Sequence, residues 1–267
     1  TWGTGLMEFE NNKLIKNYTD ANSVLNNIIP GKPYVRTSGM AMDDKGYLWI
    51  TQPEVPGTIK TLKPDGTWII NPVTIAVPTV GDILITRAGH KWVLLPRGYG
   101  LFLLDDKGTP ESFVDDVSKK IMVTDAENKV FSYYFSIAED LDGNIWIGTD
   151  QGPVVYYSPE RIFSTDLKAY RIKIPRNDGS GLADYMLGTE TITAIAVDGA
   201  NRKWIGTSGS GAYLLSPDGI TQIAHYNESN SPLFSNTITS ISVDNLTGNV
   251  WFATSKGVQS LRGDATE

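Results

Sequence analysis

Trp146-Ile147-Gly148-Thr149 is the stretch that decides the fold, because related stretches return along the whole chain. Trp204-Ile205-Gly206-Thr207 and Trp251-Phe252-Ala253-Thr254 repeat it, and Trp49-Ile50-Thr51 is a shorter copy. Trp92 begins a further copy, and Trp2-Gly3-Thr4 resembles one without its start. Successive tryptophans in this series are 43 to 58 residues apart. A strand-built repeat of this length is typical of the blades of a β-propeller.

The segment 190–226 shows one repeat unit in full. Apolar runs between turn residues predict an inner strand over 191–197, a second over 203–207, a third over 212–215 and an outer strand over 220–226. Asx, Gly and Pro residues between these runs favour tight turns. The unit therefore reads as a four-stranded antiparallel sheet.

The first turn of the unit has a fixed spacing. Asp43, Asp140 and Asp198 each precede the next tryptophan by six residues, and a Gly or Asn lies between them. Asn201 occupies the place of Gly46 in the turn, and Asn tolerates positive φ better than most residues do. The spacing therefore predicts the same turn in several sheets.

The repeated tryptophans are predicted to fill the space between neighbouring sheets. A large ring buries about 150–250 Å² in such a gap. The Gly or Ala two residues later would let the next strand approach closely. We therefore expect these indoles to be structural and buried.

Length and repeat together predict one domain over residues 1–267. The fold class is all-β, a β-propeller of about six four-stranded blade units, either part of a larger ring or incompletely closed. The first residue is Thr, and it opens inside a repeat, so we expect a fragment of a longer protein. Closing the ring would use residues outside the chain or strands from a partner.

Composition excludes several classes of partner. The net charge is −7 and no dense run of Lys and Arg exists, so we expect no nucleic acid. No apolar stretch reaches 18 residues, so we expect no direct membrane insertion. The chain has no cysteine, which excludes disulfides and thiolate metal sites. No cofactor is predicted.

The stretch 136–149 resembles the repeat of two-component regulator propellers, and 194–207 and 241–254 resemble it nearly as well. Such propellers occur in the sensor regions of hybrid histidine kinases and in PorZ-type surface proteins of the type IX secretion system. The resemblance implies a periplasmic or cell-surface binding module without catalysis, whose partners are a glycan or protein ligand and the remaining domains of a longer protein.

Two catalytic or metal alternatives have weak support in the sequence. His90 and His225 are the only histidines and fall in different repeat units, which disfavours a triad or a metal site. Asp140, Asp142 and Asn144 have the spacing of a calcium loop but lack its later carboxylate, so an Asx turn is favoured. Streptogramin lyases also have turn-Trp repeats, but their histidine and glutamate near the chain end have no good match here.

Ligand binding is predicted at the turns between second and third strands, because function usually resides in connections on a rigid scaffold. Arg97 and Tyr99 stand out, since Arg pairs with anions and Tyr stacks on sugars. Longer connections over 22–38, 115–132 and 177–189 are predicted to form a wall beside the turns. The candidate ligand-binding residues are Gln52, Glu54, Arg97, Tyr99, Asp150, Gln151, Ser208 and Ser210.

Overall fold

The computed structural model describes residues 2–266, and of Trp2 only the backbone. Strands make up its regular structure, apart from one short 3-10 helix, η1 (Pro159–Phe163). The chain divides into two compact units, and the boundary between them lies between Ile121 and Met122. None of the helices in this part of the chain is long and apolar enough to span a membrane.

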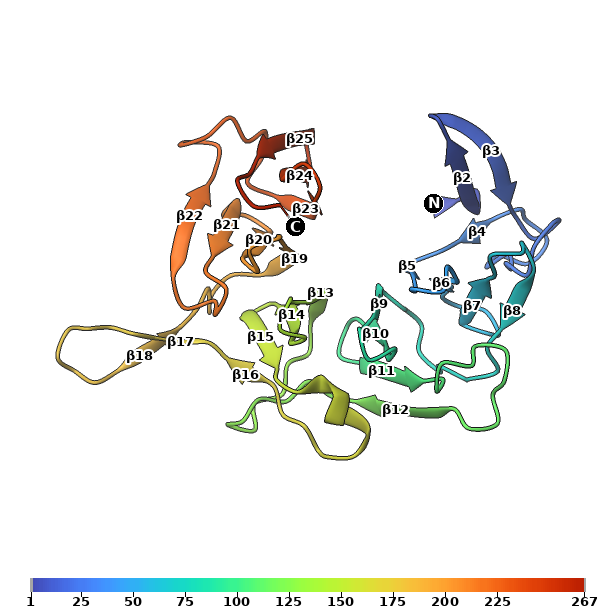
Figure 1. Ribbon diagram of the computed structural model, residues 1–267, viewed down its shortest axis with the longest axis horizontal. Helices are drawn as coiled ribbons and strands as arrows, with labels where there is room; N and C mark the ends of the chain where they lie inside the picture. Colours follow the sequence, from blue (N-terminus) through green and yellow to red (C-terminus); the bar gives the residue numbers. More distant parts are fainter. Residues whose placement is uncertain (1, 267) are drawn as a thin grey trace. The chain divides into compact units, whose positions relative to one another are not determined.

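The first unit contains two four-stranded antiparallel sheets (Figure 1). One consists of β5 (Met40–Met42), β6 (Leu48–Thr51), β7 (Ile59–Leu62) and β8 (Trp68–Ile70). The other consists of β9 (Ile83–Ile85), β10 (Lys91–Leu95), β11 (Gly100–Asp105) and β12 (Val117–Ile121). The inner strands β5 and β9 are neighbours, as expected for successive blades.

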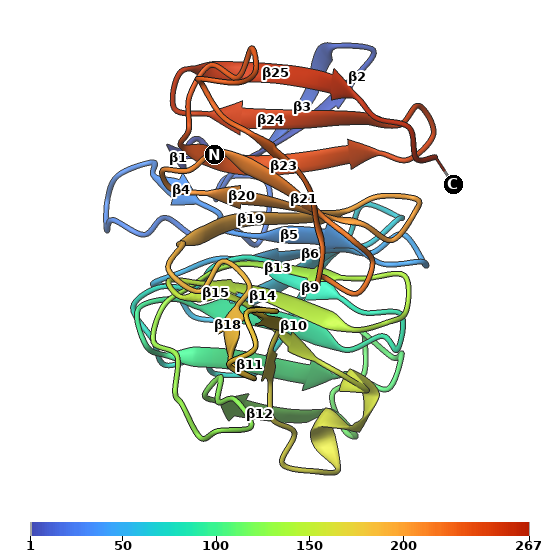
Figure 2. The same ribbon diagram turned by 90° about the vertical axis from the view of Figure 1, so that its left-hand side faces the viewer.

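The second unit contains two more four-stranded sheets and one of three strands. The first has β13 (Tyr134–Glu139), β14 (Ile145–Thr149), β15 (Gly152–Tyr156) and β16 (Tyr170–Arg171). The next has β19 (Ile192–Val197), β20 (Lys203–Thr207), β21 (Ala212–Leu215) and β22 (Gln222–Tyr226), so the strands predicted for 190–226 are confirmed. The last has β23 (Ile238–Asp244), β24 (Asn249–Thr254) and β25 (Gly257–Arg262), stacked in order in Figure 2.

The prediction of six four-stranded units is wrong for the described residues. Before β5 the chain forms two separate two-stranded sheets, β1 (Trp2–Gly3) with β4 (Val35–Arg36) and β2 (Leu6–Glu10) with β3 (Lys13–Tyr18). An unpredicted hairpin, β17 (Lys173–Pro175) with β18 (Ala183–Tyr185), occupies part of the long connection 177–189. Residues 2–266 therefore form four four-stranded sheets, one three-stranded sheet and three two-stranded sheets.

Burial of the repeated tryptophans is confirmed for four of them. Trp49, Trp92, Trp146 and Trp204 are at most 2% exposed. Trp204, for example, packs with Leu233, Ile238 and Phe252 from the following sheet and its approach. Trp251 is 45% exposed, so the prediction is wrong there, because no described sheet follows β23–β25 to cover it. The side chain of Trp2 lies outside the described residues.

The glycine two residues after Trp146 and after Trp204 permits close packing, as predicted. A Cβ added to Gly148 would lie 2.6 Å from the carbonyl oxygen of Ile192 on the next inner strand. One added to Gly206 would lie 2.6 Å from Cγ2 of Ile238. These glycines therefore set the spacing between neighbouring sheets within the second unit.

The first turn of the repeat holds the indole as well as the backbone. Asp140 accepts hydrogen bonds at Oδ1 from the backbone N–H of Asp142 (3.0 Å) and Asn144 (2.8 Å), and at Oδ2 from Nε1 of Trp146 (2.8 Å). Asp43 and Asp198 accept the indole N–H of Trp49 and Trp204 in the same way, at 2.9 and 3.2 Å. Asn201 has φ 59°, as predicted for its place in the turn.

Candidate functional site

The predicted turn residues of the first unit are partly occupied by structural contacts. Gln52 is fully buried, and its Oε1 accepts hydrogen bonds from Nζ of Lys60 (2.7 Å) and from the backbone of Asn26 (3.0 Å). Glu54 pairs with Arg36, with Oε1 2.6 Å from Nη2. Both side chains thus fasten loops within the unit.

Arg97 and Tyr99 lie in the turn between β10 and β11. Arg97 is exposed and has a left-handed backbone, with φ 62°. Tyr99 is half-buried, and Nζ of Lys120 lies 5.4 Å from its ring centre. Of the four candidates in this unit, Arg97 and Glu54 are exposed, and Glu54 is paired with Arg36.

The predicted turn residues of the second unit lie in two adjacent blades. Gln151 accepts a hydrogen bond from Nζ of Lys129, and Asp150 beside it is half-buried. Ser208 is exposed, and the carbonyl oxygen of Ser210 is 2.6 Å from Nε2 of His225. All of these residues stay candidates for ligand contact.

His225 has a structural environment that the sequence did not indicate. It lies on the outer strand β22, as predicted, and its ring stacks on Tyr213 with centroids 4.0 Å apart and planes at 4°. His90 lies between β9 and β10, as predicted, with Nε2 3.6 Å from Oδ2 of Asp105. Among residues 2–266, no cluster of His, Asp and Glu has the arrangement of a metal site.

A cavity of about 490 Å³ lies between the β13–β16 and β19–β22 sheets, at the opposite strand ends from the predicted turns. We call it the inter-sheet pocket. Its walls come from the β13–β14 turn, β14, the segment after β15, β16 and the β21–β22 turn. Its lining is Asp140, Asp142, Asn144, Trp146, Tyr157, Tyr170, Arg171, Ile172, Lys173, Pro217, Asp218 and Ile220, and none of the eight predicted residues belongs to it.

The floor of the inter-sheet pocket depends on a glycine. Gly219 has φ 75°, and a Cβ there would lie 2.5 Å from Cη2 of Trp146 and 2.6 Å from Cδ1 of Ile172. The β21–β22 turn therefore rests directly on the indole. Its Ser-Pro-Asp-Gly sequence was correctly predicted to be a turn, but the close approach of that turn to Trp146 was not.

Two tyrosines form the aromatic wall of the pocket. Tyr157 and Tyr170 are 44% and 48% exposed, and their ring centroids are 5.5 Å apart with planes at 53°. Burial and the nearby carboxylates of Asp140 and Asp218 raise the pKa of Tyr157, so its hydroxyl stays protonated at neutral pH. Two large, half-exposed rings of this kind present flat faces to a ligand.

The carboxylates around the pocket have different roles. Asp140 is buried, and although burial raises its pKa, hydrogen bonds from Trp146 and Asn144 and the charge of Lys203 lower it below the ordinary value. Its Oδ2 is 3.1 Å from Nζ of Lys203. Asp142 and Asp218 are exposed, and a hydrogen bond from Ser216 lowers the pKa of Asp218. The exposed pair can therefore accept hydrogen bonds from a ligand.

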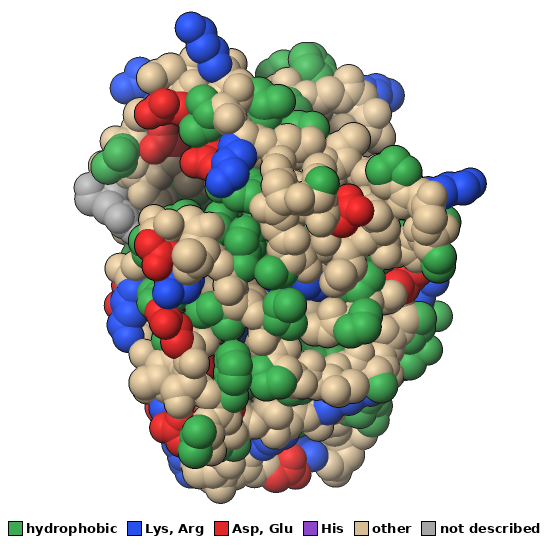
Figure 3. Space-filling view, turned by 90° about the vertical axis from the view of Figure 1, so that its right-hand side faces the viewer, with side chains coloured by type: hydrophobic (Ala, Val, Ile, Leu, Met, Phe, Trp, Pro, Cys, Tyr) green, Lys and Arg blue, Asp and Glu red, His purple; other side chains and the backbone are tan. Residues whose placement is uncertain are grey.

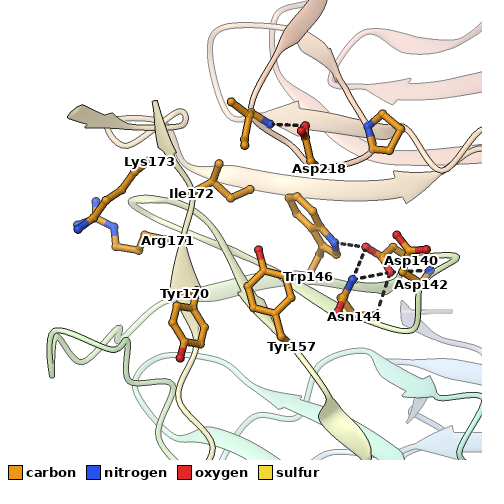
Figure 4. Close-up of a pocket in the computed structure, with 12 residues that line it drawn as sticks. Asp140, Asp142, Asn144, Trp146, Tyr157, Tyr170, Arg171, Ile172, Lys173 and Asp218 are labelled. Atoms are coloured by element: carbon orange, nitrogen blue, oxygen red, sulfur yellow. Dashed lines mark hydrogen bonds between the residues drawn. The ribbon is translucent and has the colours of Figure 1, made fainter. Parts of the chain in front are cut away.

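The two basic side chains of the pocket lining point away from its acidic residues. Figure 4 shows Arg171 and Lys173 pointing away from Asp140, Asp142 and Asn144. The guanidinium of Arg171 lies 3.4 Å from the ring centre of Tyr185, and Nζ of Lys173 is 2.6 Å from Oε1 of Glu127. Acceptor oxygens and aromatic faces, rather than positive charge, thus define the interior.

The calcium-loop alternative fails on geometry. Both carboxylate oxygens of Asp140 are used by the turn backbone, Asn144 and Trp146. Nδ2 of Asn201 donates to Oδ2 of Asp142 at 2.8 Å. The favoured prediction of an Asx turn is confirmed, and its additional bond to the indole explains the six-residue spacing.

Comparison with known proteins supports the resemblance seen in the sequence. The family model described as "Two component regulator propeller" matches residues 129–151, which include β13 and β14. No curated protein is significantly similar in sequence.

Among solved structures, PorZ of Porphyromonas gingivalis is 29% identical with a TM-score of 0.86. The match covers 98% of this chain and 36% of PorZ, so the chain spans about a third of that protein. PorZ is described as an essential bacterial surface component of the type IX secretion system.

More remote structures share the fold alone. An extracellular domain from B. thetaiotaomicron, described as part of a hybrid two-component system, is 22% identical with a TM-score of 0.59, covering 84% of this chain and 26% of that one. Virginiamycin B lyase of Staphylococcus aureus is 17% identical with a TM-score of 0.53, covering 85% and 69%. The chain is therefore an all-β propeller array that contains a two-component regulator propeller repeat and is similar in structure to PorZ.

Proposed function

We propose that this chain is a non-catalytic recognition module of an extracytoplasmic surface or secretion-system protein. The observation that carries the proposal is the likeness to PorZ, which extends over 98% of the chain. The module would act within a longer polypeptide at the cell surface or in the periplasm, together with that protein's remaining domains.

We propose the inter-sheet pocket as the place where the module binds a glycan. Tyr157 and Tyr170 offer ring faces on which a sugar can stack. Asp142, Asn144 and Asp218 add acceptors for sugar hydroxyls at the edge of the same cavity. A pocket with aromatic faces and a few convergent polar groups is the usual form of a small-ligand site.

A glycan array followed by calorimetry tests this proposal. The double variant Tyr157→Ala/Tyr170→Ala should lose at least tenfold in affinity for any glycan that the unaltered chain binds. Tyr133→Ala is the matched control, because Tyr133 is 50% exposed in the same unit and does not line the pocket. Equal affinity of the double variant and the control would refute the pocket as the site.

Variants of the turn residues predicted from the sequence provide a second comparison in the same experiment. A glycan or protein ligand that binds the double variant normally but is lost on Arg97→Ala, Asp150→Ala or Ser208→Ala would place recognition at the turns predicted from the sequence. That result would keep the recognition function and reject the inter-sheet pocket.

A sensor role in a hybrid two-component system is the second candidate function. The description of the family matched at residues 129–151 favours it. The coding sequence around this chain separates the two roles, since a membrane helix and kinase would support sensing and a β-sandwich tail would support secretion. A streptogramin-lyase-like activity is the remaining alternative, and turnover of a streptogramin that depends on His225 would establish it.

A further inference from the structure

Acidic side chains dominate the interior of the inter-sheet pocket. Asp140, Asp142 and Asp218 all contribute to its lining. The ammonium of the fully buried Lys203 lies 3.1 Å from Oδ2 of Asp140. The same ammonium donates hydrogen bonds to two backbone carbonyl oxygens, at 2.8 and 2.5 Å. Lys203 is therefore paired with Asp140, and its hydrogen bonds are used within the protein.

Asp142 and Asp218 have no ion-pair partner among residues 2–266. Oδ2 of Asp142 accepts a hydrogen bond from the amide of Asn201 at 2.8 Å. Oδ1 of Asp218 accepts from the hydroxyl of Ser216 at 2.5 Å and from the backbone N–H of Ile220 at 3.0 Å. All three donors are neutral. The hydrogen bond from Ser216 lowers the pKa of Asp218, so this carboxylate is charged at neutral pH.

The two basic residues of the lining do not compensate these carboxylates. Lys173 is paired with Glu127, and the guanidinium of Arg171 is stacked on Tyr185. Both point away from Asp142 in Figure 4. An acidic ligand would therefore meet like charges in the interior of the pocket, whereas a cationic ligand would meet opposite charges.

The aromatic wall of the pocket favours a cation as well. Tyr157 and Tyr170 are both about half exposed, with ring centroids 5.5 Å apart. The face of an aromatic ring attracts a cation that lies within about 6 Å of its centre. Burial, followed by the carboxylates of Asp140 and Asp218, raises the pKa of Tyr157, so its hydroxyl lies within electrostatic reach of both. Figure 4 shows Asp218 on the side of the pocket toward which this hydroxyl points.

We propose, on the basis of the glycan binding proposed above, that the ligand of the inter-sheet pocket is an amino sugar with a protonated, unacetylated amine. The ammonium lies against the ring of Tyr157 and donates hydrogen bonds to the carboxylate of Asp218. Asp142 adds negative charge at the edge of the same cavity. Hydrogen bonds between ionised groups are about twice as strong as neutral ones. The carboxylates therefore determine which sugar binds, and the tyrosines supply the surface on which it stacks.

Calorimetry with two trisaccharides that differ only in acetylation is the direct test. One is the fully deacetylated chitin trimer, and the other is the same trimer with every amine acetylated. At about pH 6 the free amines are charged, because this pH lies below the usual pKa of an α-amino group. The deacetylated trimer should bind about tenfold more tightly than the acetylated one. Added salt should weaken the binding of the deacetylated trimer alone.

Substitutions that remove one charge locate the ammonium. Asp218→Asn keeps the size of the side chain and a hydrogen-bond acceptor, and it should weaken binding of the deacetylated trimer about tenfold while changing that of the acetylated trimer less than about twofold. Asp142→Asn should have a smaller effect in the same direction. Asp166→Asn is the matched control, because Asp166 is exposed in the same unit and does not line the pocket. Circular dichroism checks that each variant is folded.

The outcomes separate the amino-sugar specificity from glycan binding itself. Equal affinities for the two trimers, or unchanged binding of the deacetylated trimer by Asp218→Asn, would overturn the amino-sugar proposal. If only neutral glycans bind, and Tyr157→Ala/Tyr170→Ala abolishes that binding, the pocket remains a glycan site and the amino-sugar proposal is wrong. If neither trimer nor any glycan of the array binds at millimolar concentration, both proposals are wrong.

Discussion

Truncating Trp204 should destabilise the second unit far more than truncating Trp251, although both occupy the same place in the repeat. Trp204 is 1% exposed, lies 5.6 Å from Phe252 and 5.9 Å from Tyr226 between ring centroids, and donates to Asp198. Removing a buried aromatic ring costs about 3–5 kcal/mol. Because 45% of Trp251 is exposed, Trp251→Ala loses about half as much buried area, or roughly 1.5–2.5 kcal/mol.

Urea denaturation followed by far-UV circular dichroism measures the difference. Each variant removes one tryptophan, so the pair is matched in composition. Trp204→Phe is a further control, because it keeps an aromatic ring but loses the bond to Asp198, and it should fall between the wild type and Trp204→Ala. Equal losses of unfolding free energy for the two alanine variants would show that the covering sheet does not stabilise the indole.

Three further predictions concern packing and pH. Gly148→Ala should cost about 1–3 kcal/mol of unfolding free energy, because its Cβ would lie 2.6 Å from the carbonyl oxygen of Ile192. Gly209→Ala is the control and should be neutral, because a Cβ at Gly209 would meet no atom within 4 Å. Similar melting temperatures for the two variants would contradict this prediction. Burial lowers the pKa of Lys60 to about 8, so above that pH the unfolded chain binds more protons than the folded one. The free energy of unfolding should therefore rise by on the order of 1 kcal/mol between pH 8 and 9.5. Denaturant midpoints should show the rise, and Lys60→Met should abolish it. The lowered pKa of Asp140 contributes stability that is present above pH about 4 and lost as pH falls through the folded value, so acid titration of Asp140→Asn should lack that part of the transition.

The order of strands was predictable because each strand carries its own local signal. The predicted ranges 203–207 and 212–215 match β20 and β21 residue for residue, since a turn sequence limits each end. The number of complete sheets was not predictable. Trp2 gives the signal of a repeat, but pairing of β1 with β4 depends on contacts far apart in sequence.

The inter-sheet pocket was missed because its parts are separated along the chain. Tyr170 and Asp218 look like ordinary surface residues in sequence, and only the packing of consecutive sheets brings them to one cavity. The bond between Asp140 and Trp146 could have been found, because a six-residue spacing shared with Asp43 and Asp198 calls for a reason beyond turn formation. Charge gave little guidance: on the face in Figure 3, Lys and Arg are interspersed with Asp and Glu.

In the sheets that contain Trp49, Trp146 and Trp204, the bond from the turn aspartate to the indole couples the first turn to the second strand. Lengthening that turn by one residue would pull the carboxylate off the ring, so loop grafts there should fail. The connection between β11 and β12 is long, from Asp105 to Val117, and its residues 112–115 are all exposed. Engineers who wish to display a foreign peptide on this scaffold should insert it at that connection.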